Sequence, residues 1–328
     1  MSLYRNILKQ AWGLSWSHKY LWFFGLFAAM IGTGEYEIVS QSMSGMPNFG
    51  IIDTLNRYAQ TNVFSGQTAA TLKAFMLNDP ASFVLFVAMT LLLLFVTIFI
   101  LWLTIVSQGS LVHNATQIYL KKNHDFKAGL EVGMNNFWTL AGLNVIIKFV
   151  IYFCLILMSI PVALSFKHVG LVGLNFIYLF SFLIFIPIAV VLTFIIKYAM
   201  AYRIIKGDEF YTALRRGWNL FLDNWLVSLE MAFILFFITF VAGFSILIIL
   251  LALAIPFLFL SLLVYYTISA AASSLVFALA LIIGIFVVAA FGSLITVFQI
   301  SAWTGLFLEL TGKGGVSKLV RLFDGWTK

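Results

Sequence analysis

The chain has 328 residues, of which 62% are hydrophobic, 17% are aromatic and only 9% are charged, and its formal net charge is +7. A soluble domain carries about 25% charged residues to cover its surface, so this composition excludes a soluble protein and favours one that faces lipid. The single cysteine, Cys154, excludes an intrachain disulfide. The sequence therefore predicts an all-α integral membrane protein that forms a single membrane domain over residues 1–328.

Six segments are candidate transmembrane helices, because a span needs about 20 apolar residues, with a range of roughly 17–25. Their approximate positions are 20–32, 83–106, 139–166, 169–200, 226–253 and 272–308. We interpret them as three hairpins separated by amphipathic interfacial helices. The hairpins occupy 1–112 (with an outer loop at 33–81), 113–201 and 202–308, and an amphipathic tail follows at 309–328.

Two of these segments depart from the ideal length. The first is short, and a re-entrant segment is the alternative to a full span. The fifth continues beyond residue 253 for too long to form one straight span. Pro256 is expected to break or kink it, so that residues 257–266 tilt, project or lie along the outer interface.

The basic residues are distributed unevenly between the two sides of these spans. One side receives only Arg57, Lys73 and Lys167, whereas the other carries the basic residues of both termini and of the connections between hairpins. The positive-inside rule therefore places both termini in the cytoplasm and the chain in the cytoplasmic (inner) membrane. Because topology explains the net charge and no recognition motif accompanies it, we expect anionic lipid heads as partners rather than nucleic acid.

A basic motif occurs twice before a long apolar segment, and a weaker copy opens the chain. The copies are Asp-Phe-x-x-x-Leu-x-x-Gly-Met at 125–134, Glu-Phe-x-x-x-Leu-x-x-Gly-Trp at 209–218 and Leu-x-x-Ala-Trp at 8–12. In the second copy the apolar positions fall at helical spacing on one face. These positions are Phe210, Leu214, Gly217, Phe221 and Trp225. We expect both full copies to form amphipathic helices in the cytoplasmic headgroup layer.

The second copy and the start of the chain also resemble a known family. Ile-Lys-Gly-Asp-Glu-Phe at 205–210 is followed by Ala-Leu-Arg-Arg-Gly-Trp at 213–218, and Ile-Leu-Lys-Gln-Ala-Trp at 7–12 leads to Lys-Tyr-Leu-Trp-Phe-Phe-Gly at 19–25. Such segments, alternating with six spans, resemble the bacterial glycerophosphodiester phosphodiesterase membrane-domain group and related multi-span proteins. The resemblance implies a six-span membrane fold. It does not imply phosphodiesterase activity, because that chemistry belongs to a separate soluble domain for which this sequence has no room.

The chain offers few residues for catalysis or metal binding. Its four histidines, His18, His113, His124 and His168, are not at metal-ligand spacing, and neither an H-E-x-x-H nor a G-x-S-x-G motif occurs. The glycine-rich stretch at 311–315 lacks the spacing of a phosphate-binding loop. We therefore expect no enzymatic activity, no catalytic or metal site and no cofactor.

Three charged residues fall inside the predicted spans, where a charge is unfavourable and marks a candidate functional site. Lys197 and Glu230 lie on consecutive spans, each about 7 Å inside the cytoplasmic face at 1.5 Å per residue. This equal depth predicts an ion pair, with Arg203 as a competing partner. The alternatives are that Lys197 extends to the headgroups and that Glu230 faces a water-filled vestibule without a partner. Lys148 lies about 15 Å deep with Asn144 one turn away. Either a polar, partly wet pocket or burial against backbone carbonyls would accommodate it.

The favoured hypothesis is a non-enzymatic integral membrane protein that associates with lipid, or scaffolds partners, through a basic cytoplasmic collar. The candidate contacts for anionic lipid heads are Lys121, Lys122, Arg203, Arg215 and Arg216. The alternative is a small transporter or lipid carrier with a polar path near Lys148. An intramembrane enzyme is a third hypothesis, but the clustered acids, histidines or nucleophiles that it needs are missing from the sequence. A protein partner or a homo-oligomer is left open.

Overall fold

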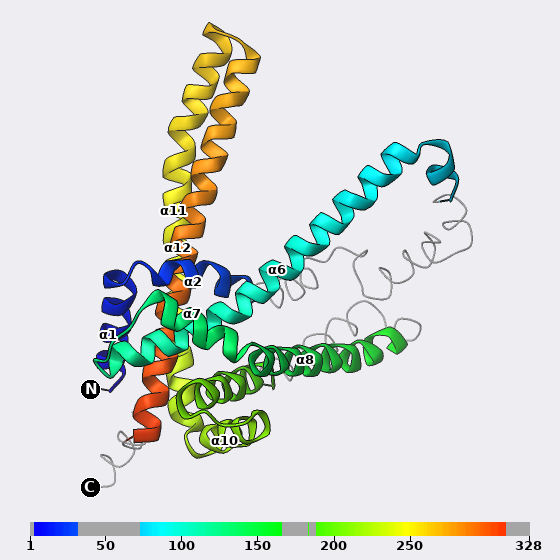
Figure 1. Cartoon of the computed structure of the whole chain (residues 1–328). Helices are drawn as coiled ribbons and strands as arrows, with labels where there is room; N and C mark the ends of the chain where they lie inside the picture. The colour runs from blue at the N-terminus through cyan, green and yellow to red at the C-terminus, as the bar shows by residue number, and fades with distance from the viewer. Residues whose placement is uncertain (1–2, 32–72, 166–182, 184–187, 313–328) are drawn as a thin grey trace. The chain divides into compact units, whose positions relative to one another are not determined.

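The computed structural model describes residues 3–31, 73–165, 183 and 188–312, and within these ranges all regular structure is helical (Figure 1). The expected all-α fold is therefore confirmed for the described residues. The chain divides into two compact units. One comprises Met1–Leu26 and Ile105–Lys328, the other comprises Phe27–Thr104, and each is described by itself.

Five helices in the described part of the chain are long and apolar enough to cross a membrane, and they indicate a multi-pass membrane protein. They correspond to the second to sixth segments expected from the sequence. They are α6 (Pro80–Tyr119), the apolar part of α8 (Phe137–Ser165), Ile188–Lys206, α11 (Trp225–Thr267) and α12 (Ala270–Gly312). Ile188–Lys206, here called helix 188–206, ends in a π-helical turn, η2 (Tyr202–Lys206).

The first expected segment is only partly described. It begins with a short helix, α2 (Leu21–Ala28), which continues as the 3-10 turn η1 (Ala29–Ile31). The 8 residues of α2 rise about 12 Å, less than half of the ~30 Å hydrocarbon layer. The rest of this segment and most of the expected outer loop lie outside the described residues, so a full span and a re-entrant segment both stay predictions.

The second unit contains the N-terminal part of α6. Asp79 caps this helix by accepting a hydrogen bond from the Ser82 amide at 3.1 Å. From Pro80 to Thr104 the helix has no charged residue, and most of its large apolar side chains are exposed. A helix that is apolar all round and exposed is suited to lipid rather than to water.

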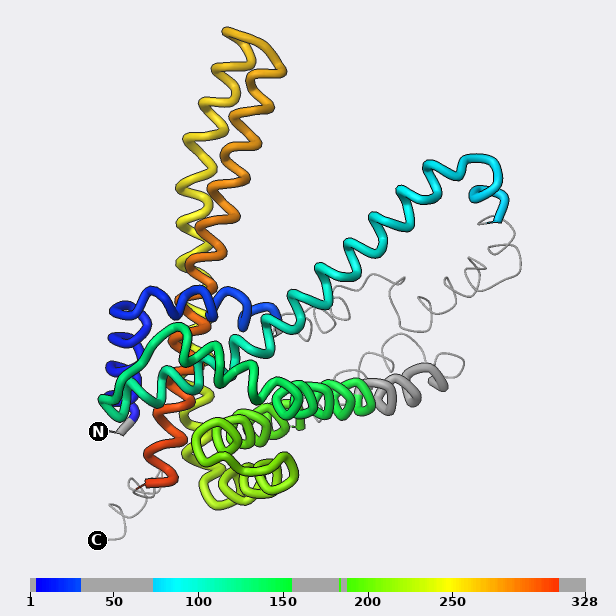
Figure 2. The backbone as a smooth tube through the Cα atoms, in the orientation of Figure 1, coloured from blue at the N-terminus to red at the C-terminus, as the bar shows by residue number. Residues whose placement is uncertain are grey.

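α11 and α12 lie side by side in the first unit and form a hairpin (Figures 1 and 2). Near their connection the hydroxyls of Ser261 and Ser273 are 2.8 Å apart and join the two helices. A break at Pro256 is not observed, because α11 continues through this residue and residues 257–266 belong to the same helix. The alternative expectation of a kink at Pro256 stays a prediction. Lipid offers the backbone no other hydrogen-bond partners, so the helix persists and loses only the bonds that proline removes.

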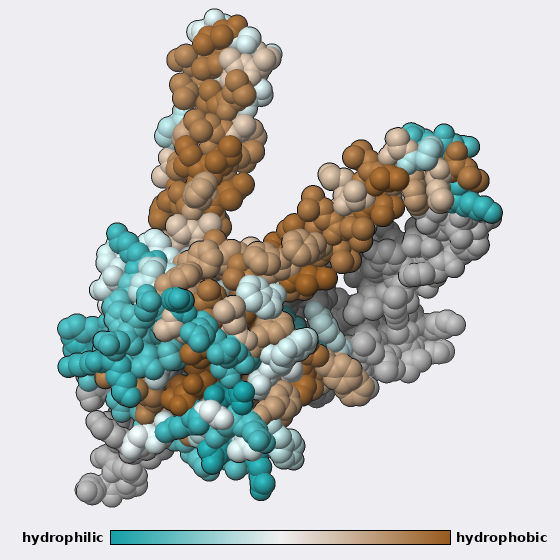
Figure 3. All heavy atoms as spheres, viewed as in Figure 1, coloured by the Kyte–Doolittle hydropathy of each residue, from teal (hydrophilic) through white to brown (hydrophobic). Residues whose placement is uncertain are grey.

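The hairpin is longer than a membrane is thick. Each of its helices has 43 residues and therefore rises about 64 Å, roughly twice the ~30 Å hydrocarbon layer. The half next to the connection exposes apolar side chains, whereas hydrophilic residues gather around the opposite end (Figure 3). Three shorter helices belong to this hydrophilic part of the unit: α1 (Leu3–Ser17), α7 (Phe126–Asn135) and α10 (Phe210–Asp223).

The core of the first unit lies at this same end of the hairpin. α1 packs along α12 and buries Ile7 and Ala11. A second cluster joins α8 to helix 188–206 and includes Leu140, Leu143 and Ile196. Between helices able to cross a membrane such contacts stabilise by van der Waals packing rather than by removal from water, so this end of the unit has the packing of a folded core, whereas the other end of the hairpin is left exposed.

Candidate functional site

The second motif copy forms α10, which is seated on helix 188–206 through two small residues, Ala213 and Gly217. A Cβ placed on Gly217 would lie 2.8 Å from the carbonyl oxygen of Ile195 and 2.9 Å from the amide nitrogen of Ala199. The two helices thus meet backbone to backbone, as small residues four positions apart allow. A larger residue at position 217 would push the helices apart, because these backbone atoms cannot rotate aside.

The first motif copy forms α7 and repeats this arrangement against α6. Gly129 and Gly133 are buried, and a Cβ on Gly133 would overlap the carbonyl oxygen of Val106 and lie 2.6 Å from the Ser110 hydroxyl. The glycine common to both copies is therefore the contact between an amphipathic helix and a long one. One expected position is wrong: Trp225 begins α11 and is exposed, so it does not belong to the buried face of α10.

A polar network fixes the turn that leads into α10. Gly207 has a φ of +74°, a left-handed conformation that glycine adopts without strain. Arg203 donates from Nε to Oδ1 of Asn136 at 2.7 Å and from Nη1 to the carbonyl oxygen of Asp208 at 3.0 Å. Nη1 of Arg216 donates to both carboxylate oxygens of Asp208 at 2.9 Å. Arg203 and Arg216 therefore hold this turn in place.

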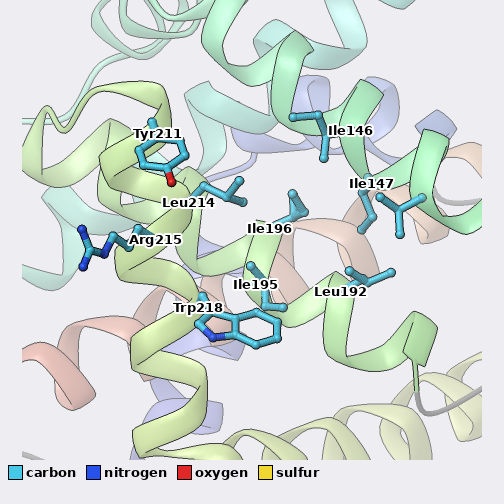
Figure 4. A pocket seen from close by; sticks show the side chains of 10 residues that line it. Ile146, Ile147, Leu192, Ile195, Ile196, Tyr211, Leu214, Arg215 and Trp218 are labelled. Carbon is cyan, nitrogen blue, oxygen red and sulfur yellow. The ribbon is translucent and has the colours of Figure 1, made fainter.

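A cavity of about 330 Å³ lies where α10 meets α8 and helix 188–206 (Figure 4), which is small for a ligand site, since these span about 300–1,000 Å³. Its lining residues are Ile146, Ile147 and Val150 of α8, Leu192, Ile195 and Ile196 of helix 188–206, and Tyr211, Leu214, Arg215 and Trp218 of α10. The two long helices contribute only aliphatic side chains. In Figure 4 the guanidinium of Arg215 points away from them. The cavity thus has aliphatic walls and one charged residue at its rim.

The five basic residues expected to contact lipid heads have different surroundings. Arg203 and Arg216 are engaged in the turn before α10. Arg215 lines the cavity, and no acidic side chain in the described part of the chain forms an ion pair with it. Lys121 and Lys122 are exposed in the turn after α6 and do not line the cavity. The structure therefore singles out Arg215 among these five candidates.

Sequence reasoning did not identify the other residues of the rim. Tyr211, Arg215 and Trp218 are spaced i, i+4 and i+7, so they share one face of α10. This combination of two aromatic residues and one arginine was a usable signal. The aliphatic walls carried no such signal, because apolar residues occur throughout α8 and helix 188–206.

Lys197 and Glu230, the predicted ion pair, lie on two helices of the first unit. Nζ of Lys197 lies 4.5 Å from the ring centroid of Trp303, which is a cation–π contact. The carboxylate of Glu230 accepts a hydrogen bond from the hydroxyl of Tyr4, at the start of α1. Neither contact was expected from the sequence, and the ion pair between Lys197 and Glu230 stays a prediction.

Lys148, the third intramembrane candidate, is half-buried on α8. It does not line the cavity, although Ile146, Ile147 and Val150 beside it do. Asn144, one turn away, donates hydrogen bonds to Oε1 of Gln108 at 3.1 Å and to the carbonyl oxygen of Leu140 at 2.9 Å. The Asn144 amide therefore bridges α8 to α6.

Two of the four histidines lie close together near the start of α7. The rings of His18 and His124 are 4.7 Å apart between centroids, and the hydroxyl of Tyr20 lies 3.1 Å from Nδ1 of His124. Within the described ranges, no three residues of the types that ligate metals gather into a potential metal site. Ring packing and two hydrogen bonds account for this cluster, since Nδ1 of His18 also lies 3.3 Å from the carbonyl oxygen of Leu14.

Comparison of the chain with known protein families, curated proteins and solved structures finds no match.

Proposed function

We propose that this chain is a non-enzymatic, multi-pass protein of the cytoplasmic membrane that associates with anionic lipid through a basic collar on its cytoplasmic face. The basic collar is defined as Lys121, Lys122, Arg203, Arg215 and Arg216. We further propose six spans in three hairpins with both termini in the cytoplasm, and membership of the six-span group that the motif copies resemble. The orientation rests on the uneven distribution of basic residues along the sequence.

One observation carries this proposal: α10 buries a small-residue face against a long apolar helix and exposes a mixed aromatic and basic face. Ala213 and Gly217 are buried, whereas Tyr211 is 74% exposed, Trp218 is 46% exposed, and Arg215 and Arg216 are exposed. Tyrosine and tryptophan favour the boundary between hydrocarbon and water, where a basic side chain also finds anionic phosphates. A helix with this surface is suited to the headgroup layer.

The length of the α11–α12 hairpin also supports a position of its packed end at or beyond the cytoplasmic surface of the hydrocarbon layer. If its exposed apolar half occupies the ~30 Å hydrocarbon layer, about half of its 64 Å length extends past that layer. The packed end, where α1 covers α12 and hydrophilic residues gather, then begins at the cytoplasmic headgroups and extends beyond them (Figure 3). Charged residues such as Glu230 and Lys197 are less unfavourable there than at the centre of the hydrocarbon.

The alternative function, a transporter or lipid carrier with a polar path near Lys148, has less support. Asn144, which would extend such a path, is engaged by Gln108 and by the Leu140 carbonyl. The cavity beside Lys148 has aliphatic walls from α8 and helix 188–206 rather than polar ones. We therefore favour lipid association over transport.

The lipid preference of the reconstituted protein tests the proposal. Spin-labelled phosphatidylglycerol and phosphatidylcholine report by electron paramagnetic resonance how much of each lipid is immobilised on the protein. We expect more immobilised phosphatidylglycerol than phosphatidylcholine, and we expect the difference to shrink at high salt because the charges are exposed. Equal immobilisation of both lipids by the wild-type protein would contradict the proposal.

A variant and a control locate the effect on the collar. Lys121→Gln, Lys122→Gln and Arg215→Gln together remove the collar charges that are not engaged in the turn before α10. This triple variant is expected to lose most of the preference for phosphatidylglycerol, at up to about 1 kcal/mol per basic residue. Lys73→Gln, on the opposite face in the proposed topology, is expected to leave the preference unchanged. If Lys73→Gln abolished the preference instead, the proposed orientation would be wrong.

A further inference from the structure

We infer that the cavity between α8, helix 188–206 and α10 is a binding site for one anionic phospholipid of the surrounding bilayer. Its phosphate contacts Arg215, and the beginning of one hydrocarbon chain lies between the two long helices. This inference rests on the proposed function and adds to it a single defined site, distinct from the general attraction of the collar.

The shape of the cavity follows from how three helices cross. Gly217 holds α10 against the backbone of helix 188–206, and Leu143 and Ile147 of α8 pack with Ile196 in the same core cluster. Beside this crossing point the space is left open, and Val150 lies among its lining residues.

The walls of the cavity fit hydrocarbon. On α8 they run from Ile146 to Val150, and on helix 188–206 from Leu192 to Ile196, so each wall is about 6 Å long at 1.5 Å per residue. That length matches the first few carbons of a lipid chain, and the rest of the chain would lie along the apolar surfaces of both helices. Both are among the helices able to cross a membrane, so a chain in this place would lie parallel to them in the bilayer.

The rim of the cavity fits an anionic head. Arg215 can offer a planar fork of N–H groups to a phosphate, and no acidic side chain in the described ranges neutralises it. Its neighbour Arg216 is held by Asp208, so the two adjacent arginines have different roles. Tyr211 and Trp218 flank Arg215 on the same face of α10 and are suited to the glycerol and carbonyl region of a lipid.

The charge at the rim and the apolar walls together favour an anionic phospholipid over other ligands of this cavity. A free inorganic phosphate would leave the aliphatic walls unused, and a zwitterionic lipid such as phosphatidylcholine would bring its cationic choline group close to Arg215, which repels it. A soluble peptide would have to reach a cavity whose two long walls belong to helices able to cross a membrane. A phospholipid whose head group carries a net negative charge satisfies both the rim and the walls.

Native mass spectrometry of the purified full-length protein tests the site. The protein is extracted in a mild detergent, titrated with phosphatidylglycerol or phosphatidylcholine, and the number of retained lipids is counted. We expect one phosphatidylglycerol to be retained preferentially over phosphatidylcholine. Arg215→Gln should weaken this binding about tenfold, the loss expected when one charge-assisted hydrogen bond to a phosphate is removed.

Matched controls separate the site from the attraction of other basic residues and from misfolding. Val150→Trp fills the cavity from α8 and should also weaken binding about tenfold, whereas Phe149→Trp, on the exposed neighbouring position that does not line the cavity, should have less than about twofold effect. Lys206→Gln removes an exposed basic residue that belongs neither to the collar nor to the cavity lining, and it should likewise have less than about twofold effect. Circular dichroism melting identifies a misfolded variant, and Leu192→Trp then replaces Val150→Trp as the filled cavity.

Three results would overturn the inference, and they differ from failure of the proposed function. One is that Arg215→Gln retains phosphatidylglycerol as strongly as the wild type. Another is that Lys206→Gln weakens binding as much as Arg215→Gln, because any basic residue near the headgroups would then serve. The third is preferential retention of phosphatidylcholine. In each case the spin-label preference for anionic lipid can persist, so the site fails while the proposed function stands; loss of the spin-label preference as well means that both fail.

Discussion

α7 and α10 are built alike but present different surfaces. Each begins after an acidic residue, buries two small residues four positions apart and ends before a long apolar helix. Three of the differences between their exposed faces fall at the positions that line the cavity in α10. The residues in α10 and α7 respectively are Tyr211 and Lys127, Arg215 and Glu131, and Trp218 and Met134. The buried pair therefore determines how the helix sits on its neighbour, whereas the exposed face determines what it can contact. We conclude that only α10 presents an arginine at the position that lines the cavity.

The largest expected effect comes from the glycine that the two copies share. Gly217→Leu places side-chain atoms against the backbone of Ile195 and Ala199, and Gly133→Leu does the same at Val106. Each should destabilise the protein by about 1–3 kcal/mol or more, the usual range for overpacking, measured as a lower melting temperature in detergent. Gly243→Leu is the control, because nothing lies within 4 Å of a Cβ there. If Gly217→Leu were as stable as this control, α10 would not be seated as described.

A loss of stability no larger than this is expected when the predicted ion pair between Lys197 and Glu230 is broken. The helices that carry this pair lie on either side of α10, and no such pair is predicted beside α7. The hydroxyls of Tyr198 and Ser228 are 2.7 Å apart and join helix 188–206 to α11 next to Lys197 and Glu230. Glu230→Gln should destabilise the protein by about 1–3 kcal/mol, and Lys197→Met should partly restore stability in the double variant. Equilibrium unfolding of the four proteins of this cycle measures the coupling. Strictly additive losses of unfolding free energy in the single and double variants would show that Lys197 and Glu230 do not form an ion pair.

The other buried small residue of α7 tests why the two copies differ there. Gly129 faces the buried Asn114 of α6, and a Cβ at position 129 would overlap the Asn114 amide. The corresponding residue of α10 is Ala213, which is buried. Gly129→Ala should therefore cost about 1–2 kcal/mol, and Asn114→Ala in the same chain should remove most of that loss in thermal melting. If Gly129→Ala destabilised the protein equally with and without Asn114, the loss would not come from a clash between these two residues.

The smallest effects are expected from exchanging the charges that distinguish the two exposed faces. Arg215→Glu should reduce the spin-label preference for phosphatidylglycerol more than Arg215→Gln, because it adds repulsion of the phosphates to the loss of attraction. Glu131→Arg should increase the preference by up to about 1 kcal/mol, the contribution of one basic residue near a membrane surface. If the preference for phosphatidylglycerol falls in Arg215→Glu and rises in Glu131→Arg, the two exposed faces differ in charge as described. If it changes in neither variant, neither face lies near the headgroups.

The sequence predicted where the helices lie in the chain better than it predicted how they pack against one another. The motif copies became α7 and α10 because their apolar and small residues recur at helical spacing, which is a local property. Of the break or kink expected at Pro256, the break is wrong, because a local rule for proline is overridden where the backbone has no water to bond with. The Tyr4 and Trp303 contacts of the charged pair join residues far apart in the sequence. The cavity could not be predicted from the sequence either, because it depends on how three helices pack against one another.

The depth of α10 in the bilayer tests the central claim most directly. Spin labels on single cysteines at positions 211 and 218, and at Asn219 on an adjoining exposed position, can be introduced into a Cys154→Ser chain and reconstituted. Collision rates with oxygen and with a water-soluble nickel chelate then give the depth of each label. We predict that the labels at 211 and 218 lie at the level of the phosphates and glycerol, with the label at 219 closer to water. Labels at 211 and 218 that were fully accessible to the nickel chelate, or deep in the hydrocarbon, would contradict a basic collar in the headgroup layer.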